Sequence, residues 1–360
     1  MRLFRSAGVL LVLFLVGPPL CGCGSPRDAR PPVVLDLSPT VYLDGRGDTA
    51  AVMGTDFSSA GDPRWRAFLV ERDGRPRLVQ SGEGIPTGLA LSPTGSRLLV
   101  AWREPADGER EPEHRVTVLD LTDDNTVVAD QFTHESILSP FFGATCWNSD
   151  GTAWLSLRPG DCYLIHREGH ALALPRVLND PGVGHTILRW LSDSGDSAYH
   201  LASDGVVHCI TPSLVSSVMR VPVGEDVRTT VRGRATAVGE ALFLLSENQL
   251  TRADLTTKSV ATKALQGLSE GGWSARHVLA VSGETLVVAA LKEEGDVEHW
   301  NVYALHFPTL RRRMLASLSV PESSGILSIG GDPERIWIAY PDGSGEKTLL
   351  TSRSLPRWEE

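Results

Sequence analysis

The chain has 360 residues, of which 41% are hydrophobic, 22% charged and only 6% aromatic, with 35 Gly and 23 Pro. This composition excludes a collagen-like repeat, a disordered polymer and a multi-span membrane protein, and it favours a globular chain with many turns. The formal net charge is −10. Because no long Lys/Arg stripe offsets it, the charge argues against nucleic acid as a partner.

The first 22 residues are predicted to be an export signal. Arg2 and Arg5 make its start positive, and the apolar run AGVLLVLFLV follows at residues 7–16. This run is too short to cross a bilayer as a helix, and the Gly-Pro-Pro that follows ends any helix.

Leu20, Cys21, Gly22 and Cys23 follow this signal. With Leu at −3, a small residue at −1 and Cys at +1, the segment resembles the lipobox of bacterial lipoproteins. The resemblance implies that residues 1–22 are removed and that the Cys23 thiol takes a diacylglycerol. It also implies an exported protein, anchored through the lipidated Cys to the extracytoplasmic side of a bacterial membrane. The alternative is a plain secretory signal with an incidental Cys.

Residues 23–32 are predicted to be a short Pro-rich tether, and residues 33–360 a single folded domain. Cys146, Cys162 and Cys209 lie in this domain. An extracytoplasmic compartment permits disulfides. Cys146 and Cys162 flank one predicted hairpin and are the candidate pair, with free buried thiols as the alternative.

A strand–turn–strand phrase recurs along the domain. The turn residues are Gly47, Gly95, Gly151, Gly195, Gly239, Gly283 and Pro333, separated by 48, 56, 44, 44, 44 and 50 residues. Glycine suits these places because such hairpin turns often need a positive φ. A third apolar run follows each hairpin and a fourth follows most, so each unit predicts four short strands.

Four strands in about 45 residues are typical of one β-propeller blade. We therefore expect an all-β fold with a single propeller of seven four-stranded blades. Six or eight blades, or two β-sandwich domains, are the alternatives. The last unit lacks a fourth strand, and the apolar run at residues 33–37 lacks a partner. We predict that this N-terminal strand pairs beside residues 348–350 and closes the ring, which removes an exposed sheet edge.

Three segments carry a resemblance to known propellers. Residues 91–95, LSPTG, resemble the S-P-D-G turn of WD40-like and Tol-system propeller repeats. Residues 118–120 and 252–254, each ending in Asp, resemble the end of the third strand in such repeats. No repeat carries a Trp-Asp pair. The resemblance implies a propeller over nearly the whole mature chain and says almost nothing about activity.

No motif predicts a catalytic residue, a cofactor or a metal site. Residues 343–348, GSGEKT, lack the spacing of a phosphate loop. The tripeptide at residues 46–48, RGD, spells an adhesion motif, but it falls on a repeat turn that already accounts for it. His166 and His170 share one hairpin, and His200 and His208 share the next. Their spacing matches no metal site and favours ordinary surface or hydrogen-bonded histidines.

One basic cluster stands out, at residues 311–313, RRR. An edge strand with outward charges is favoured there over a binding patch. Long charged loops are expected between second and third strands, at residues 56–64, 103–114 and 292–299. Loops on a rigid scaffold commonly carry recognition, so these loops are candidate contact regions. The tryptophans in or beside these loops are Trp65, Trp102, Trp273 and Trp300. Packing explains most of them, and an exposed one would be a contact residue.

We predict a membrane-anchored, extracytoplasmic binding or scaffold protein with a monomeric domain, which recognises an envelope protein or ligand through one propeller face. The alternatives are a propeller enzyme, a hydrolase or lyase acting on glycan or peptide, and a sensor of a metal or small ligand. Acids and histidines gathered at the inner strands would favour the enzyme, and an apolar, Trp-lined loop face would favour the binding protein.

Overall fold

The computed structural model describes residues 31–38, 41–56, 63–71, 73–105, 114–121, 127–134, 146–147, 153–158, 161–165, 171–173, 186–192, 197–211, 213–229, 233–246, 248–268, 270–322 and 327–358. The signal, Cys23 and most of the tether lie outside this part. No helix among the described residues is long and apolar enough to cross a membrane.

Nearly all the regular structure is β. The strands are β1 (Val33–Leu35), β2 (Val41–Arg46), β3 (Thr49–Asp56), β4 (Arg64–Glu71), β5 (Pro76–Glu83), β6 (Ile85–Leu91), β7 (Arg97–Arg103), β8 (His114–Asp120), β9 (Val127–His134), β10 (Cys146–Trp147), β11 (Ala153–Arg158), β12 (Asp161–Ile165), β13 (Ala171–Ala173), β14 (Thr186–Leu191), β15 (Ala198–Ala202), β16 (Val206–Ile210), β17 (Val215–Arg220), β18 (Ala235–Val238), β19 (Ala241–Ser246), β20 (Gln249–Asp254), β21 (Ser259–Ala264), β22 (Ser274–Ala280), β23 (Thr285–Glu294), β24 (Val297–His306), β25 (Arg312–Pro321), β26 (Ser328–Gly331), β27 (Arg335–Pro341) and β28 (Thr348–Ser354). Two short helices, α1 (Glu225–Thr229) and the 3-10 turn η1 (Glu270–Gly272), lie between sheets and have no counterpart in the sequence prediction.

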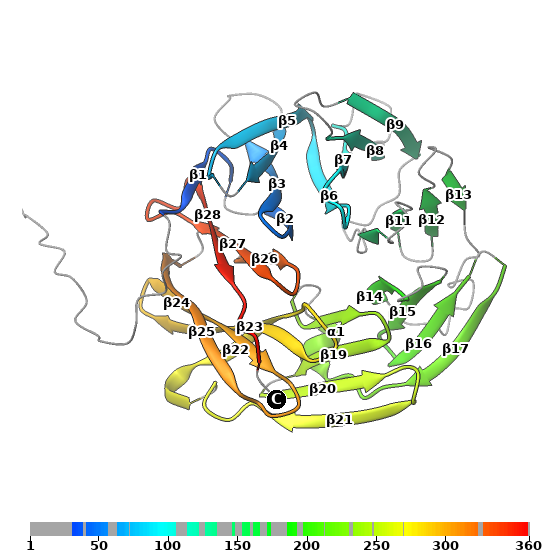
Figure 1. The fold of residues 1–360 in the computed structure, drawn as a ribbon, viewed down its shortest axis with the longest axis vertical. Coiled ribbons are helices and arrows are strands. Elements are labelled where there is room, and N and C mark those ends of the chain that lie inside the picture. Colours follow the sequence, from blue (N-terminus) through cyan, green and yellow to red (C-terminus); the bar gives the residue numbers. More distant parts are fainter. Residues whose placement is uncertain are drawn as a thin grey trace, which may run out of the picture.

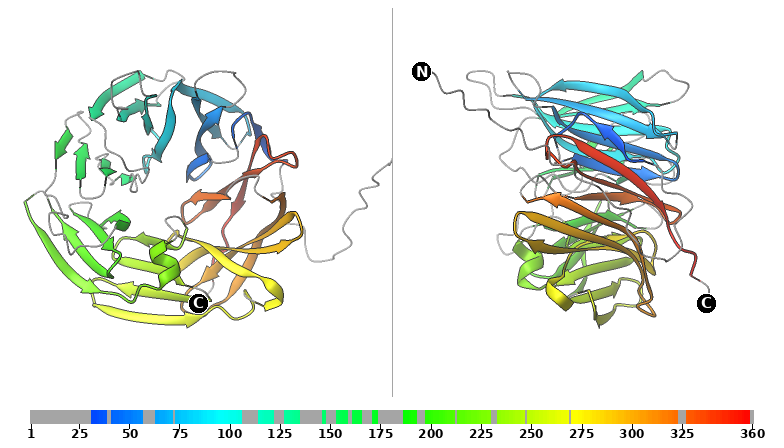
Figure 2. Two further views of the ribbon diagram at one scale, coloured as in Figure 1. Left: turned by 180° about the vertical axis from the view of Figure 1, so that it is seen from behind. Right: turned by 90° about the vertical axis from the view of Figure 1, so that its left-hand side faces the viewer.

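In the part of the chain that the structure describes, these strands form seven four-stranded antiparallel sheets. The sheets stand around a common axis with their first strands toward the centre and their outer strands at the rim (Figure 1). Seen edge-on, the strands cross the thickness of the disc (Figure 2). The prediction of an all-β fold with a single propeller is confirmed.

The repeat turns lie where the sequence places them. Each described one falls between the first and second strand of a different sheet: Gly47, Gly95, Gly239, Gly283 and Pro333. Gly151 and Gly195 lie outside the described residues. Gly47, Gly95 and Gly239 have the expected positive φ of 50°, 69° and 52°. Gly283 does not, so the conformational reason given for that glycine is wrong.

The N-terminal strand closes the ring. β1 is the outer strand of the last sheet, whose order is β1-β28-β27-β26. Val33 pairs with Leu350 and Leu35 with Thr348, which confirms the predicted pairing. From β1 the chain passes directly to β2, the inner strand of the first sheet. One covalent segment therefore joins the two ends of the ring.

The core lies between sheets. Each described apolar cluster draws its buried side chains from two neighbouring sheets, as when Val287 and Val302 of one sheet pack with Ile336 and Ile338 of the next. Middle strands are buried on both faces: Val52 and Met53 are adjacent, point in opposite directions and are both fully buried. The core is thus a ring of interfaces, and each sheet depends on its neighbours.

One loop prediction is wrong. Residues 292–299 are not a long loop, because β23 and β24 pair as far as Glu294 and Val297 and meet in a tight turn. Residues 57–62 and 106–113, the centres of the other two loops, lie outside the described residues. The basic cluster behaves as expected of an edge, since Arg312 begins β25 and β25 is the outer strand of its sheet.

Candidate functional site

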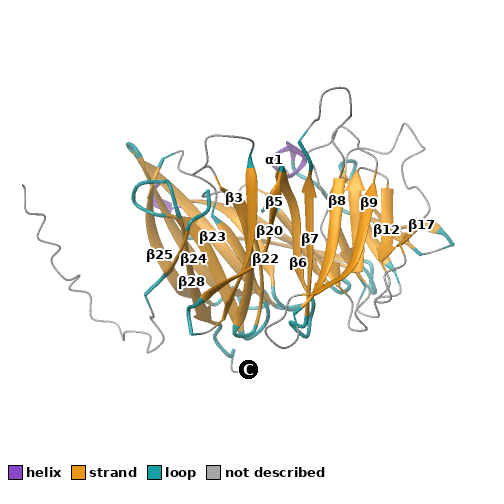
Figure 3. Ribbon diagram, turned by 90° about the horizontal axis from the view of Figure 1, so that it is seen from above, coloured by secondary structure: helices purple, strands orange, loops and turns teal. Residues whose placement is uncertain are grey.

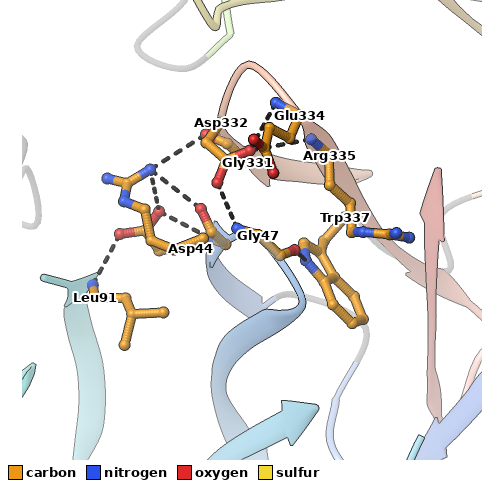
Figure 4. Close-up of polar contacts among 10 residues, drawn as sticks. Asp44, Gly47, Leu91, Gly331, Asp332, Glu334, Arg335 and Trp337 are labelled. Carbon is orange, nitrogen blue, oxygen red and sulfur yellow. Dashed lines mark hydrogen bonds and ion pairs between the residues drawn. The ribbon is translucent and has the colours of Figure 1, made fainter. Parts of the chain in front are cut away.

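A cluster of charged side chains joins three inner strands. Five charged residues form this cluster, here called the inner-strand junction: Asp44, Arg46, Asp48, Asp332 and Arg335. They come from the β2–β3 and β26–β27 hairpins, and Asp44 contacts β6. Figure 4 shows Asp44, Asp332 and Arg335 with their partners. The sequence puts acids and arginines beside repeat turns, where short polar side chains satisfy the turn amides.

Asp44 links the first sheet to the second. Its Oδ2 accepts a hydrogen bond from the backbone N–H of Leu91 on β6 at 2.8 Å, and its Oδ1 accepts one from Gly45 at 2.8 Å. Burial raises the pKa of the Asp44 carboxyl, and Asp332 acts in the same sense, while Arg46 and the two N–H donors lower it. The net direction is upward, so removal from water outweighs the favourable contacts.

Asp332 links the last sheet to the first. Its Oδ1 accepts hydrogen bonds from the amides of Glu334 (2.9 Å) and Arg335 (3.0 Å) within its own turn. Its Oδ2 accepts the amide of Gly47 across the boundary. Arg46 returns the contact, because its Nη1 donates to the Gly331 carbonyl at 3.2 Å and lies 3.5 Å from the Asp44 carboxylate.

Arg335 and Trp337 add two contacts across the same boundary between the last and the first sheet. Arg335 Nε lies 3.1 Å from Asp48 Oδ1, and Trp337 Nε1 donates to the Gly47 carbonyl at 3.2 Å. A Cβ on Gly45 would meet the Trp337 ring at 2.5 Å, so only glycine lets the indole pack there.

These contacts decide what the inner-strand junction can do. Both oxygens of Asp44 and of Asp332 accept backbone amides, and Arg46 and Asp48 each have a partner. A general acid or base needs an atom within reach of substrate. The contacts of this cluster therefore hold neighbouring sheets together. The adhesion tripeptide at residues 46–48 takes part in these contacts.

The opposite side of the disc, called here the hairpin face, carries the β23–β24 turn and the helix α1 (Figure 3). Lys292 pairs with Glu294, and the hydrogen bond and charge of Lys292 lower the pKa of that exposed carboxyl. His299 Nε2 lies 3.6 Å from Glu294 and His299 Nδ1 lies 2.9 Å from Ser319 Oγ. Val297, at the tip, is 36% exposed.

A second polar group lies beside α1 on the same face. Arg234 Nη1 donates to Asp226 Oδ2 at 3.0 Å, and Ser246 donates to Asp226 Oδ1 at 2.6 Å. Burial lowers the pKa of Arg234, although Asp226 acts in the opposite sense. The helix is thereby fixed to the sheet below, so the hairpin face has a defined shape.

The tryptophans of the predicted recognition loops serve mostly in packing. Trp65, Trp102 and Trp300 are 0%, 9% and 6% exposed, and the first two rings are 4.8 Å apart. Trp273 is half-buried beside η1. An apolar, Trp-lined face is therefore not what the described residues present.

Two histidines pair across one hairpin. His200 and His208 are opposite each other in β15 and β16, with ring centroids 5.9 Å apart. Burial lowers the pKa of His208, and Asp204 acts against this. His166 and His170 lie outside the described residues. Among the residues that can be placed, no group of three or more His, Cys, Asp and Glu could hold a metal ion.

The candidate disulfide conflicts with the strand order. Cys146 is on β10 and Cys162 on β12, and β11 lies between them. Strands two positions apart are separated by roughly 9–10 Å, whereas a disulfide joins Cα atoms about 4.4–6.8 Å apart. This backbone register therefore does not allow the bond. Cys209 is a free, half-buried thiol.

Comparison with solved structures then identifies the architecture. A chain of the mitotic checkpoint complex aligns with a TM-score of 0.55 and 11% identity over 94% of this chain and all of that one. The β-propeller domain of Myceliophteria thermophila Cps50 (Swd1) aligns with a TM-score of 0.53 and 15% identity over 89% of this chain and 99% of that domain. The fold is a WD40-like β-propeller.

The other comparisons give no name. No family model matches the chain, and no curated protein matches it. In all, 942 chains of solved structures match this chain. A propeller so widely used does not by itself single out an activity. It is compatible with a role as a protein-interaction scaffold.

Sequence reasoning missed the inner-strand junction. Asp44 and Asp332 sit beside turns, where Asp commonly accepts amide hydrogen bonds, and that signal was present. Their partners across the sheets, Leu91 and Gly47, lie 47 and 285 residues away in the sequence. No local pattern predicts such distant partners.

Proposed function

We propose that this chain is an exported protein, held on the extracytoplasmic side of a bacterial membrane by a lipid on Cys23, whose propeller binds a protein partner through the hairpin face. Residues 1–22 would be the signal peptide, residues 23–32 the lipidated tether and residues 33–360 the binding domain. The lipobox-like segment at residues 20–23 supports the anchor.

The contrast between the two sides of the disc supports the choice of face. On the side of the repeat turns, the inner-strand junction uses its acids and arginines to hold sheets together. On the hairpin face, the ten-residue strands β23 and β24 end in an exposed tip. That tip holds one Lys against several acids, which favours a partner with a basic surface.

A rigid ring suits this role. The helix α1 and the β23–β24 tip are held by hydrogen bonds and ion pairs, so little conformational entropy is lost when a partner docks. One of the structural neighbours is a component of a protein complex, which supports a binding role for this propeller.

The enzyme alternative has less support. The acids at the inner strands are those of the inner-strand junction, and their carboxylate oxygens accept backbone amides. A catalytic pair would need a carboxylate left open toward substrate.

Site-specific photo-crosslinking in intact cells tests the proposed face. We expect benzoylphenylalanine at Val297, on the hairpin tip, to give discrete crosslinked products of higher mass. Benzoylphenylalanine at Thr94, exposed in the β6–β7 repeat turn on the other side of the disc, is the matched control. Products from position 94 and none from position 297 would overturn the choice of face.

A further inference from the structure

A groove lies at the rim between two neighbouring sheets, away from the inner-strand junction and the hairpin tip. It has a volume of about 500 Å³ and runs between the end of β21 and the β24–β25 turn. Its floor is formed by leucines, and a lysine and an arginine stand over it; these residues are Leu265, Leu268, Leu305, Leu310, Lys263 and Arg312.

The floor is part of the core. Leu265, Leu268 and Leu305 are each 3% exposed or less and pack in the cluster that joins these two sheets. Leu310 adopts a positive φ of 57°, a conformation that is unfavourable for a residue with a side chain. The β24–β25 turn thus places a leucine at the groove where glycine or asparagine would fit the backbone better.

Both cations are held in place. Arg312 Nη1 donates to the Gln266 carbonyl at 2.9 Å, and its guanidinium lies 5.8 Å from the centre of the Tyr303 ring. A Cβ on Gly267 would come within 2.8 Å of Arg312 Nη2, so glycine leaves room for the guanidinium. Lys263 donates to the Pro308 carbonyl, and its ammonium lies 5.2 Å from the centre of the Phe307 ring.

Neither cation is neutralised by an acid. No carboxylate of the described residues lies within 4 Å of Lys263 or Arg312. In the rest of the described chain, arginines commonly have such a partner, as in the pairs of Arg66 with Asp56 and of Arg234 with Asp226. In a chain of net charge −10, two uncompensated cations over an apolar floor form a local site for a negative charge.

We infer that this groove binds a single-chain anionic amphiphile, with a carboxylate on Arg312 and Lys263 and an alkyl chain on the leucine floor. Arg312 keeps most of its five N–H donors available after its bond to Gln266. A carboxylate accepts two of them side by side. The alkyl chain would lie against the half-buried Leu310, the leucine of the groove that water still contacts.

The size of the groove favours a small molecule over a protein segment. Ligand pockets commonly measure about 300–1,000 Å³ and combine an apolar lining with a few fixed polar groups. A stable protein interface instead covers about 800 Å² on each partner. The groove has the dimensions and composition of the first class.

Isothermal titration with decanoate, below its micellar concentration, tests the inference on the folded domain. We expect one binding site for decanoate, and no measurable binding of acetate or of decyltrimethylammonium, which lack the chain or reverse the charge. Arg312→Gln should weaken decanoate binding by about tenfold, the size expected for a lost charged hydrogen bond. Lys263→Gln should weaken it in the same direction.

Arg313→Gln is the matched control, because Arg313 is the next residue on the same strand and does not line the groove. Its affinity should stay within about twofold of the parent, since only a remote charge is removed. Equal binding of decanoate and decyltrimethylammonium, or equal losses in Arg312→Gln and Arg313→Gln, would refute the site. Arg312-dependent binding of a hexaglutamate peptide without binding of decanoate would make the groove a peptide site and overturn the proposal.

Discussion

Asp332 shows how one side chain can serve both its own turn and the whole ring. One carboxylate oxygen accepts the amides of Glu334 and Arg335, as a turn aspartate ordinarily does. The other accepts the amide of Gly47, on the far side of the closure. The same β27-containing sheet has a second turn aspartate, Asp342, whose Oδ1 contacts stay within its own turn.

Replacing each of these two aspartates separates the two roles. Asp332→Ala should lower the free energy of unfolding by about 1–3 kcal/mol more than Asp342→Ala, because only the first leaves an amide of another sheet without its charged acceptor. Urea unfolding followed by circular dichroism measures both. Equal losses would mean that the bond to Gly47 adds nothing to stability.

The short strand β1 is the element on which closure depends. Leu35 and Leu37 are each 1% exposed in the cluster between the last and first sheets. Thr348 Oγ1 donates to the carbonyl of Ser38 at 2.9 Å, which fixes the chain as it leaves β1. Three paired residues are few, so these buried side chains supply much of the stabilisation.

Truncating two neighbouring side chains of β1 tests whether the buried one stabilises the closure of the ring. Leu35→Ala should cost about 2–5 kcal/mol, the range for a buried leucine, while Val34→Ala, at a side chain 56% exposed, should cost under about 0.5 kcal/mol. The midpoint of urea unfolding at unchanged slope reports the difference. If Leu35→Ala were as mild as Val34→Ala, β1 would not be a tightly docked closing strand.

At the level of elements, the sequence predicts what depends on neighbours in the chain. Gly47, Gly95 and Gly239 mark hairpins because their turns need a positive φ. The hairpin at residues 292–299 was mistaken for a loop because its charged residues hide the strand pattern, although they pair across β23 and β24. The helix α1 has five residues, too few for a helical period to show.

The groove and the inner-strand junction could not be predicted from the sequence, because both depend on contacts between distant segments. The groove joins residues 263–268 to residues 305–312, and the inner-strand junction joins residues 44–48 to residues 331–335. Each half is an ordinary turn or strand end. Only the ring brings the halves together, so neither could be derived from local patterns.

As a whole, the molecule is a ring of mutually buried sheets with a covalent link from its rim to the N-terminal segment. Since β1 begins at Val33, the proposed tether from Cys23 to Pro32 would leave from the rim of the disc. A short tether of this kind keeps the propeller close to the bilayer. Two acyl chains hold a protein there far more firmly than one.

Fractionation of cells that express the full chain tests the central proposal most directly. The parent protein and Cys21→Ala should stay with membranes after a high-salt wash, because the proposed lipid on Cys23 would be retained in both. Cys23→Ala should appear in the soluble exported fraction, since the apolar run before it is too short to span a bilayer. Cys23→Ala that stays in the washed membranes as completely as Cys21→Ala would contradict the lipid anchor.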